Sequence, residues 1–128
     1  MYAQSLSCEQ EADVEILLFV YLAGGLLLGG LSLPMILGKV PPNWLYGFRI
    51  SKTVNDPQAW YPVNRRMGKW LLATSLIFLL AAVILFFLPG VSVDAYALGC
   101  LAAFTVPFIA GIVHSWQLLK TIRSPILD

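Results

Sequence analysis

The polar side chains best suited to bind a ligand lie in one stretch of the sequence, where Asn43, Arg49 and Asn64 stand among aromatic residues. A guanidinium offers five donors in a planar fork that matches carboxylate and phosphate groups. Arg49 is therefore expected to hold a lipid headgroup, to pair with Asp56 or to clamp carbonyl groups of the chain. Each asparagine amide has both donors and acceptors, so Asn43 and Asn64 are expected to tie the two arms of the stretch together.

The rest of the sequence offers no catalytic constellation. It contains no nucleophile–base pair, phosphate-binding loop or zinc-ligand spacing, so we expect no catalytic residue, no metal and no cofactor. The one histidine, His114, lies toward the end of an apolar segment. An ionisable residue inside a membrane often marks a functional site, but a solvated or hydrogen-bonded histidine at the membrane interface is the alternative that this position favours.

The elements that must position these side chains are membrane helices. Of the 128 residues, 59% are hydrophobic and 12% are charged, whereas soluble domains have about 45–50% apolar and about 25% charged residues. Three runs without Asp, Glu, Lys or Arg cover about 16–37, 70–88 and 95–119, and roughly 20 apolar residues cross a bilayer core as a helix. The sequence predicts an all-α integral membrane protein, a single domain over 1–128 with three transmembrane helices.

The only long polar stretch, 38–69, is predicted to be a loop with a short interfacial helix. Pro41-Pro42 prevents the first helix from continuing, and Gly47 permits a tight bend. Pro57 is favourable at the first position of a helix. The candidates for that helix's cap are Thr53, Asn55 and Asp56.

A helix leading into the second span is indicated by Trp60, Asn64 and Gly68, which recur at a spacing of four residues. That spacing places side chains on one helix face. Pro62 conflicts with this helix unless the helix begins near Tyr61 or kinks there.

The charges predict the orientation. Every Lys and Arg falls in the first loop or the C-terminal tail, whereas the N-terminal tail is acidic and the 89–94 link has no cation. Cytoplasmic loops carry the excess of Lys and Arg, so the loop and the C-terminus are expected inside and the N-terminus outside. The basic residues are Lys39, Arg49, Lys52, Arg65, Arg66, Lys69, Lys120 and Arg123. They are few and lie against the membrane, so nucleic-acid binding is not expected.

Small residues mark the faces where helices approach closely. Gly25 and Gly29 form a GxxxG pattern in the first span, and the third span has small residues at a spacing of four. Such residues promote helix association in lipid. The third-span stripe comprises Ala95, Gly99, Ala103, Pro107, Gly111 and Ser115. Packing within one three-helix bundle and contact with a second copy or another partner both remain open.

The loop resembles the SdpI family, which is named for a bacterial immunity protein against a secreted sporulation-delaying toxin. The family pattern is roughly Pro-x-Asn-x-x-x-Gly-x-Arg, then Thr, then Trp-x-x-x-Asn-Arg-x-x-Gly between two membrane spans. The matching residues are Asn43, Tyr46, Gly47, Phe48, Arg49, Thr53, Trp60, Asn64, Arg65 and Gly68. The resemblance implies a multi-pass protein of the bacterial cytoplasmic membrane. In the archetype, the protein protects its host and also sequesters a transcriptional repressor.

Two functions are therefore expected as alternatives. In the first, the chain acts by binding, in toxin immunity or membrane-linked signalling. Its protein partner would be a toxin or a regulator, in addition to the lipid bilayer that surrounds it. In the second, it is a structural or accessory subunit of a larger membrane complex, joined through the third-span stripe. The cluster Arg65, Arg66 and Lys69 either sets topology and meets anionic lipids or docks an acidic partner.

Overall fold

The computed structural model describes residues 2–122, without the side chains of residues 2–4 and 6. The described chain is helical throughout, apart from connecting segments. Its elements are α1 (Tyr2–Ile36), α2 (Ser51–Val54), α3 (Pro57–Phe87) and α4 (Val93–Thr121). The three long helices are each long and apolar enough to cross a membrane. The predicted fold class is confirmed, while Arg123 of the expected basic tail lies outside the described residues.

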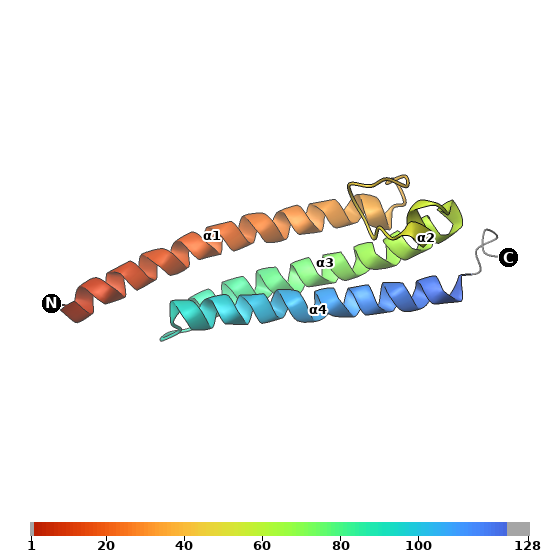
Figure 1. Cartoon of the computed structure of the whole chain (residues 1–128). Coiled ribbons are helices and arrows are strands. Elements are labelled where there is room, and N and C mark those ends of the chain that lie inside the picture. Colours follow the sequence, from red (N-terminus) through yellow and green to blue (C-terminus); the bar gives the residue numbers. More distant parts are fainter. Residues whose placement is uncertain (1, 123–128) are drawn as a thin grey trace.

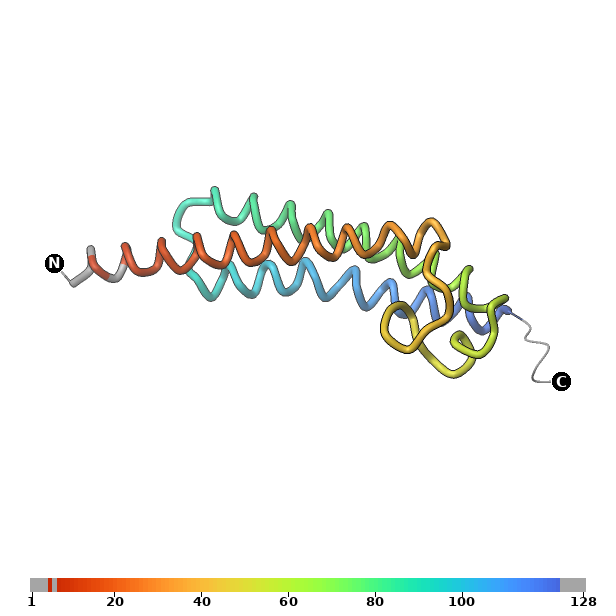
Figure 2. The backbone as a smooth tube through the Cα atoms, turned by 90° about the horizontal axis from the view of Figure 1, so that it is seen from above, coloured from red at the N-terminus to blue at the C-terminus, as the bar shows by residue number. Residues whose placement is uncertain are grey.

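The three long helices run side by side, with the α1–α3 connection at one end and the α3–α4 turn at the other (Figure 1). Helix α3 packs against both α1 and α4, which contact each other far less. The first few turns of α1 extend beyond the α3–α4 turn (Figures 1 and 2). We call that end of the bundle the N-terminal end, and the opposite end the loop end.

The helices are longer than the apolar runs from which they were predicted. Helix α1 begins at Tyr2 and includes the acidic segment before Ile16. Helix α3 begins at Pro57, so it takes in the second half of the predicted loop 38–69. Because roughly 20 residues cross the bilayer core, α1 and α3 extend past that core at opposite ends of the bundle.

The start of α3 follows from its first residues. Asp56 Oδ1 accepts a hydrogen bond from Gln58 N–H at 2.9 Å, and Pro57 occupies the first helical position. A side-chain cap satisfies an amide that has no partner inside the helix, and proline at this position loses no helical bond. The helix then continues through Pro62, so it starts at Pro57 and not near Tyr61.

Two of the turns between helices contain a glycine with positive φ. Helix α1 ends at Ile36, just after Pro34, and Gly38 has a φ of 67°. Gly90 has a φ of 76° in the turn between α3 and α4. Ser92 then caps α4 by accepting a hydrogen bond from Ala95 N–H at 3.2 Å.

Small residues of α1 lie against α3. A Cβ atom at Gly25 would lie 2.5 Å from Cδ2 of Leu79, and one at Gly29 would lie 2.8 Å from Oγ of Ser75. The Ser75 hydroxyl donates a hydrogen bond to the Gly25 carbonyl at 2.7 Å. Both positions of the GxxxG pattern therefore contact α3 within the chain.

Three residues of the third-span stripe also contact α3. A Cβ atom at Gly99 would lie 2.6 Å from Leu85 Cδ1, and one at Gly111 would lie 2.6 Å from Trp70 Cβ. The buried Ser115 hydroxyl lies 3.7 Å from the Met67 sulfur. Ala103 is only partly covered.

Candidate functional site

The connection between α1 and α3 is anchored on α3 by Trp60. Its side chain is fully buried, and its indole Nε1–H donates a hydrogen bond to the Val40 carbonyl at 2.7 Å. A buried indole N–H needs such a partner. The bond holds the first residues of the connection against the start of α3.

Asn43 shapes the next turn. Its Oδ1 accepts hydrogen bonds from Leu45 N–H at 2.9 Å and from Tyr46 N–H at 2.7 Å, while its Nδ2 donates to the Pro41 carbonyl at 2.8 Å. Asparagine favours such turns because its side chain can satisfy nearby backbone groups. The turn displays Trp44, which is 65% exposed, and Leu45, which is 90% exposed.

Asn64 joins the connection to α3. Its Oδ1 accepts a hydrogen bond from Phe48 N–H at 2.6 Å, and its Nδ2 donates to the Trp60 carbonyl at 3.0 Å. Gly47 makes this approach possible, because its φ is 110° and a Cβ atom there would lie 2.5 Å from Asn64 Oδ1. The expected link between the two arms is thus made by Asn64, while Asn43 bonds within its own turn.

Thr53 closes the connection. Its buried hydroxyl accepts a hydrogen bond from Ile50 N–H at 3.0 Å. The same oxygen lies 2.8 Å from the Phe48 carbonyl and 2.9 Å from the Ile50 carbonyl, either of which accepts its proton. Thr53 thus stabilises the first turn of α2 from within that helix, whereas the cap of α3 is Asp56.

Arg49 lies at the surface of the connection. Its Nη1 donates a hydrogen bond to the Trp44 carbonyl, and its side chain is exposed. One of the three roles expected for this guanidinium, the clamp on a loop carbonyl, is present in the structure.

The last two motif residues lie on α3. Gly68 lets α1 approach, since a Cβ atom there would lie 2.9 Å from Met35 Cβ and 3.1 Å from the Ile36 nitrogen. Arg65 is exposed and lines a groove of about 340 Å³ together with Arg66 and Lys69. Gly68 thus positions the helices, whereas Arg65 contributes positive charge to the surface.

An open apolar pocket of about 370 Å³ lies between the connection and the three long helices. Its walls include Met35, Phe48, Met67 and Phe108, and Tyr46 and Arg49 are among its lining residues. The Tyr46 hydroxyl is buried without a hydrogen-bond partner among the described residues. Burial raises the pKa of this phenol above its usual value.

Lys52 is an anchor that the sequence motif did not reveal. Its ammonium donates hydrogen bonds to the carbonyls of Leu119 at 3.2 Å and Ile122 at 3.1 Å. Carbonyls at the end of a helix lack partners inside the helix, and a cation there is favoured. Lys52 therefore attaches the connection to the end of α4, through contacts so distant in sequence that no local pattern predicts them.

His114 lies apart from this assembly. Its ring stacks on Trp70 with centroids 4.9 Å apart, and its Nδ1 hydrogen bonds to the Ala110 carbonyl at 2.8 Å. The carbonyl can only accept, so Nδ1 carries the proton in this bond.

Comparison with known proteins agrees with the resemblance of the loop. The SdpI/YfhL protein family matches residues 39–115, which include the connection, α3 and most of α4. No curated protein and no solved structure matched the chain. The matched residues form more than half of the chain and contain all the loop residues described above. The chain belongs to the SdpI/YfhL protein family.

Proposed function

We propose that this chain acts by binding, without catalysis, in toxin immunity or membrane-linked signalling. Its family membership supports a membrane protein of the SdpI immunity type. The observation that carries the binding role is the surface formed by Trp44, Leu45 and Arg49, which we call the loop surface.

The buried residues of the motif have a different role from the exposed residues of the loop surface. The polar groups of Trp60, Asn64 and Thr53 bond to the chain itself. Their role is to hold the connection in one shape. Trp44 and Leu45 instead project from the turn that Asn43 makes.

The chemistry of the loop surface suits a protein partner. Tryptophan and arginine are the residue types that most often dominate binding energy at protein interfaces. A pre-ordered surface also loses little conformational entropy on binding. We therefore assign this surface to a cytoplasmic regulator.

The proposed location is the bacterial cytoplasmic membrane, with the loop end inside. All eight Lys and Arg residues belong to the connection, the start of α3 or the C-terminal part of the chain. This distribution follows the positive-inside rule.

The accessory-subunit alternative rested on the small-residue stripe of the third span. Gly99, Gly111 and Ser115 of that stripe face α3 in the same chain. The stripe therefore gives that alternative no separate support.

The test compares cells that produce the wild type with cells that produce Trp44→Ala/Leu45→Ala. Both are challenged with the sporulation-delaying toxin against which the immunity protein that gives the family its name protects. We expect the wild type to protect and to retain a soluble regulator on native purification. The double variant should lose the regulator, because its apolar anchors are gone while the turn remains. Trp116→Ala is the matched control, since Trp116 is also exposed but lies on α4.

Retention of protection and of the regulator by the double variant, at wild-type protein level, would exclude the loop surface as the binding site. A stoichiometric membrane partner in place of a soluble regulator would support the accessory-subunit alternative instead.

A further inference from the structure

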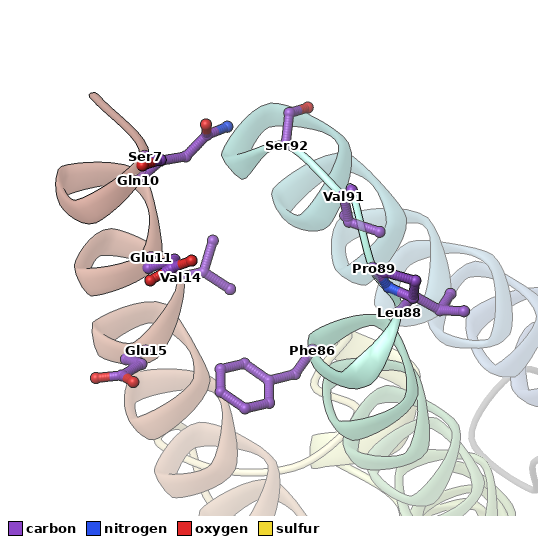
Figure 3. Close-up of a pocket in the computed structure, with 11 residues that line it drawn as sticks. Ser7, Gln10, Glu11, Val14, Glu15, Phe86, Leu88, Pro89, Val91 and Ser92 are labelled. Carbon is purple, nitrogen blue, oxygen red and sulfur yellow. The ribbon is translucent and has the colours of Figure 1, made fainter. Parts of the chain in front are cut away.

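Another recess lies at the N-terminal end of the bundle, where α1 passes the α3–α4 turn. This groove has a volume of about 600 Å³. One wall is formed by α1 and the other by Phe86 and residues 88–92 (Figure 3). Val14 and Phe86 face each other across it (Figure 3).

The groove combines apolar walls with negative charge. Leu88 and Val91 add to the apolar surface of Val14 and Phe86, while Glu11 and Glu15 lie one helical turn apart on the α1 wall. Among the residues that the structure describes, no Lys or Arg lines it. Each of these carboxylates therefore has no cationic neighbour within the groove.

The surroundings strengthen this negative field. Glu9 and Asp13 belong to the same segment of α1, and Asp94 lies in the first turn of α4. All eight cations lie elsewhere in the sequence, in residues 39–69 and 120–123. Carboxylates gathered beside an apolar recess attract cations and repel anions.

We propose that this groove binds a cationic amphipathic peptide from outside the cell. Leucine-like side chains of the peptide would pack on Val14 and Phe86, and a Lys or Arg would pair with Glu11 and Glu15. A helix that lays its apolar face in a groove is a common mode of peptide recognition. The inference rests on the proposed immunity function, for which it names the chemical class of the toxin.

A phospholipid headgroup fits this groove less well. Its phosphate would come close to Glu11 and Glu15, and like charges repel. A basic peptide side chain brings a cation without that anion. The groove thus favours a peptide over the lipid that surrounds the protein.

The binding test uses the full chain in phosphatidylcholine nanodiscs and a fluorescein-labelled amphipathic peptide of Lys and Leu. Empty nanodiscs give the affinity of the peptide for lipid alone, and the protein should add a saturable component. Glu11→Gln/Glu15→Gln should weaken that component about five- to tenfold, as expected from two partly exposed charge pairs.

The matched control is Glu9→Gln/Asp13→Asn, which removes two charges at the same spacing from the same segment. Neither residue lines the groove, so binding should stay close to that of the wild type. Val14→Trp, which fills the groove without a change in charge, should abolish the saturable component. Equal weakening by both charge variants, unchanged binding by Val14→Trp, or no binding beyond that of empty nanodiscs would overturn the proposal.

Survival under toxin challenge separates this inference from the proposed function. If the wild type and Glu11→Gln/Glu15→Gln protect equally at equal protein level, the groove is not the toxin site and the immunity function stands. If the nanodisc results hold but the wild type gives no protection against any secreted toxin, the immunity function fails and the peptide site stands.

Discussion

The side-chain oxygen of Asn64 accepts a hydrogen bond from the backbone N–H of Phe48 at 2.6 Å. Asn64 is 3% exposed and is fixed on α3, whereas Phe48 lies in the connection that precedes α2. The side-chain amide of Asn64 therefore fixes the connection, which carries Trp44 and Leu45, to helix α3.

Replacing Asn64 with leucine should loosen this connection. The Phe48 amide would lose its acceptor, and a polar group left without a partner costs about 1–3 kcal/mol. Thermal unfolding in detergent should show the loss of stability, and hydrogen exchange should speed up at Phe48. Asn55→Leu is the control, because Asn55 is exposed. Equal behaviour of the two variants would contradict this role of Asn64.

Replacing Gly47 with alanine should be more costly than the same change at Gly90. Both glycines have positive φ, of 110° and 76°, and a side chain in such a conformation costs of order 1–3 kcal/mol. Only at Gly47 would the added Cβ also collide with Asn64, since nothing lies within 4 Å at Gly90.

The two variants can be compared by thermal unfolding in the same detergent, with exchange of the Phe48 amide as the local measurement. The Gly47 variant should show lower stability and faster exchange than the Gly90 variant. Equal losses would mean that the backbone conformation alone, and not the contact with Asn64, requires glycine at position 47.

The three spans were predictable because uncharged apolar runs of this length are typical of helices that are surrounded by lipid. The helical extension at 2–15 was not predicted, because charged side chains there report exposure to water and do not distinguish a protruding helix from a loop. A helix leading into the second span was indicated by the spacing of Trp60, Asn64 and Gly68, but its start at Pro57 was not predicted. Asp56 and Pro57, which were expected at the start of the short interfacial helix, are the local signal for that start.

The site was predictable only in part: its motif residues were identified, but its contacts between distant parts of the chain were not. The motif identified Asn43, Asn64 and Gly47 as a group. Glycine and asparagine indicate turns, and the side-chain amides of asparagine indicate hydrogen bonds to the backbone. It did not show that Lys52 reaches the end of α4 or that Ser75 bonds to Gly25. Such pairs join residues brought together only by helix packing, and a single sequence contains no periodicity that relates them.

Replacing Gly25 with valine should separate α1 from α3. A Cβ atom there would lie 2.5 Å from Leu79 and 3.3 Å from Phe78, and overpacking of this kind costs about 1–3 kcal/mol. Gly24→Val introduces the same side chain in the same helix, at a position with nothing within 4 Å.

Thermal unfolding in detergent should therefore show a loss for Gly25→Val that Gly24→Val does not share. A larger loss of stability for Gly24→Val would mean that the face of α1 that carries Gly24 contacts another molecule.

Replacing Lys52 with methionine should fray the end of α4. The variant keeps much of the apolar stem but removes the donor to Leu119 and Ile122. A cation at a helix C-terminus contributes about 0.3–1 kcal/mol, so the global loss should be small. Hydrogen exchange should nevertheless rise in the last turn of α4. Lys39→Met, at an exposed residue of the same connection, should leave that exchange unchanged.

The two native cysteines provide a direct test of the proposed orientation. Cys8 is exposed near the start of α1, whereas Cys100 is fully buried within the bundle. A membrane-impermeant maleimide added to intact cells should label the wild type at Cys8, because the segment before Ile16 lies outside in the proposed topology. Cys8→Ser should abolish the label, and Cys100→Ser should leave it unchanged. Labelling that appears only after the cells are broken would place the N-terminus in the cytoplasm. The groove at that end would then be closed to any peptide arriving from outside, and the connection with its cations would lie on the outer face, against the positive-inside rule.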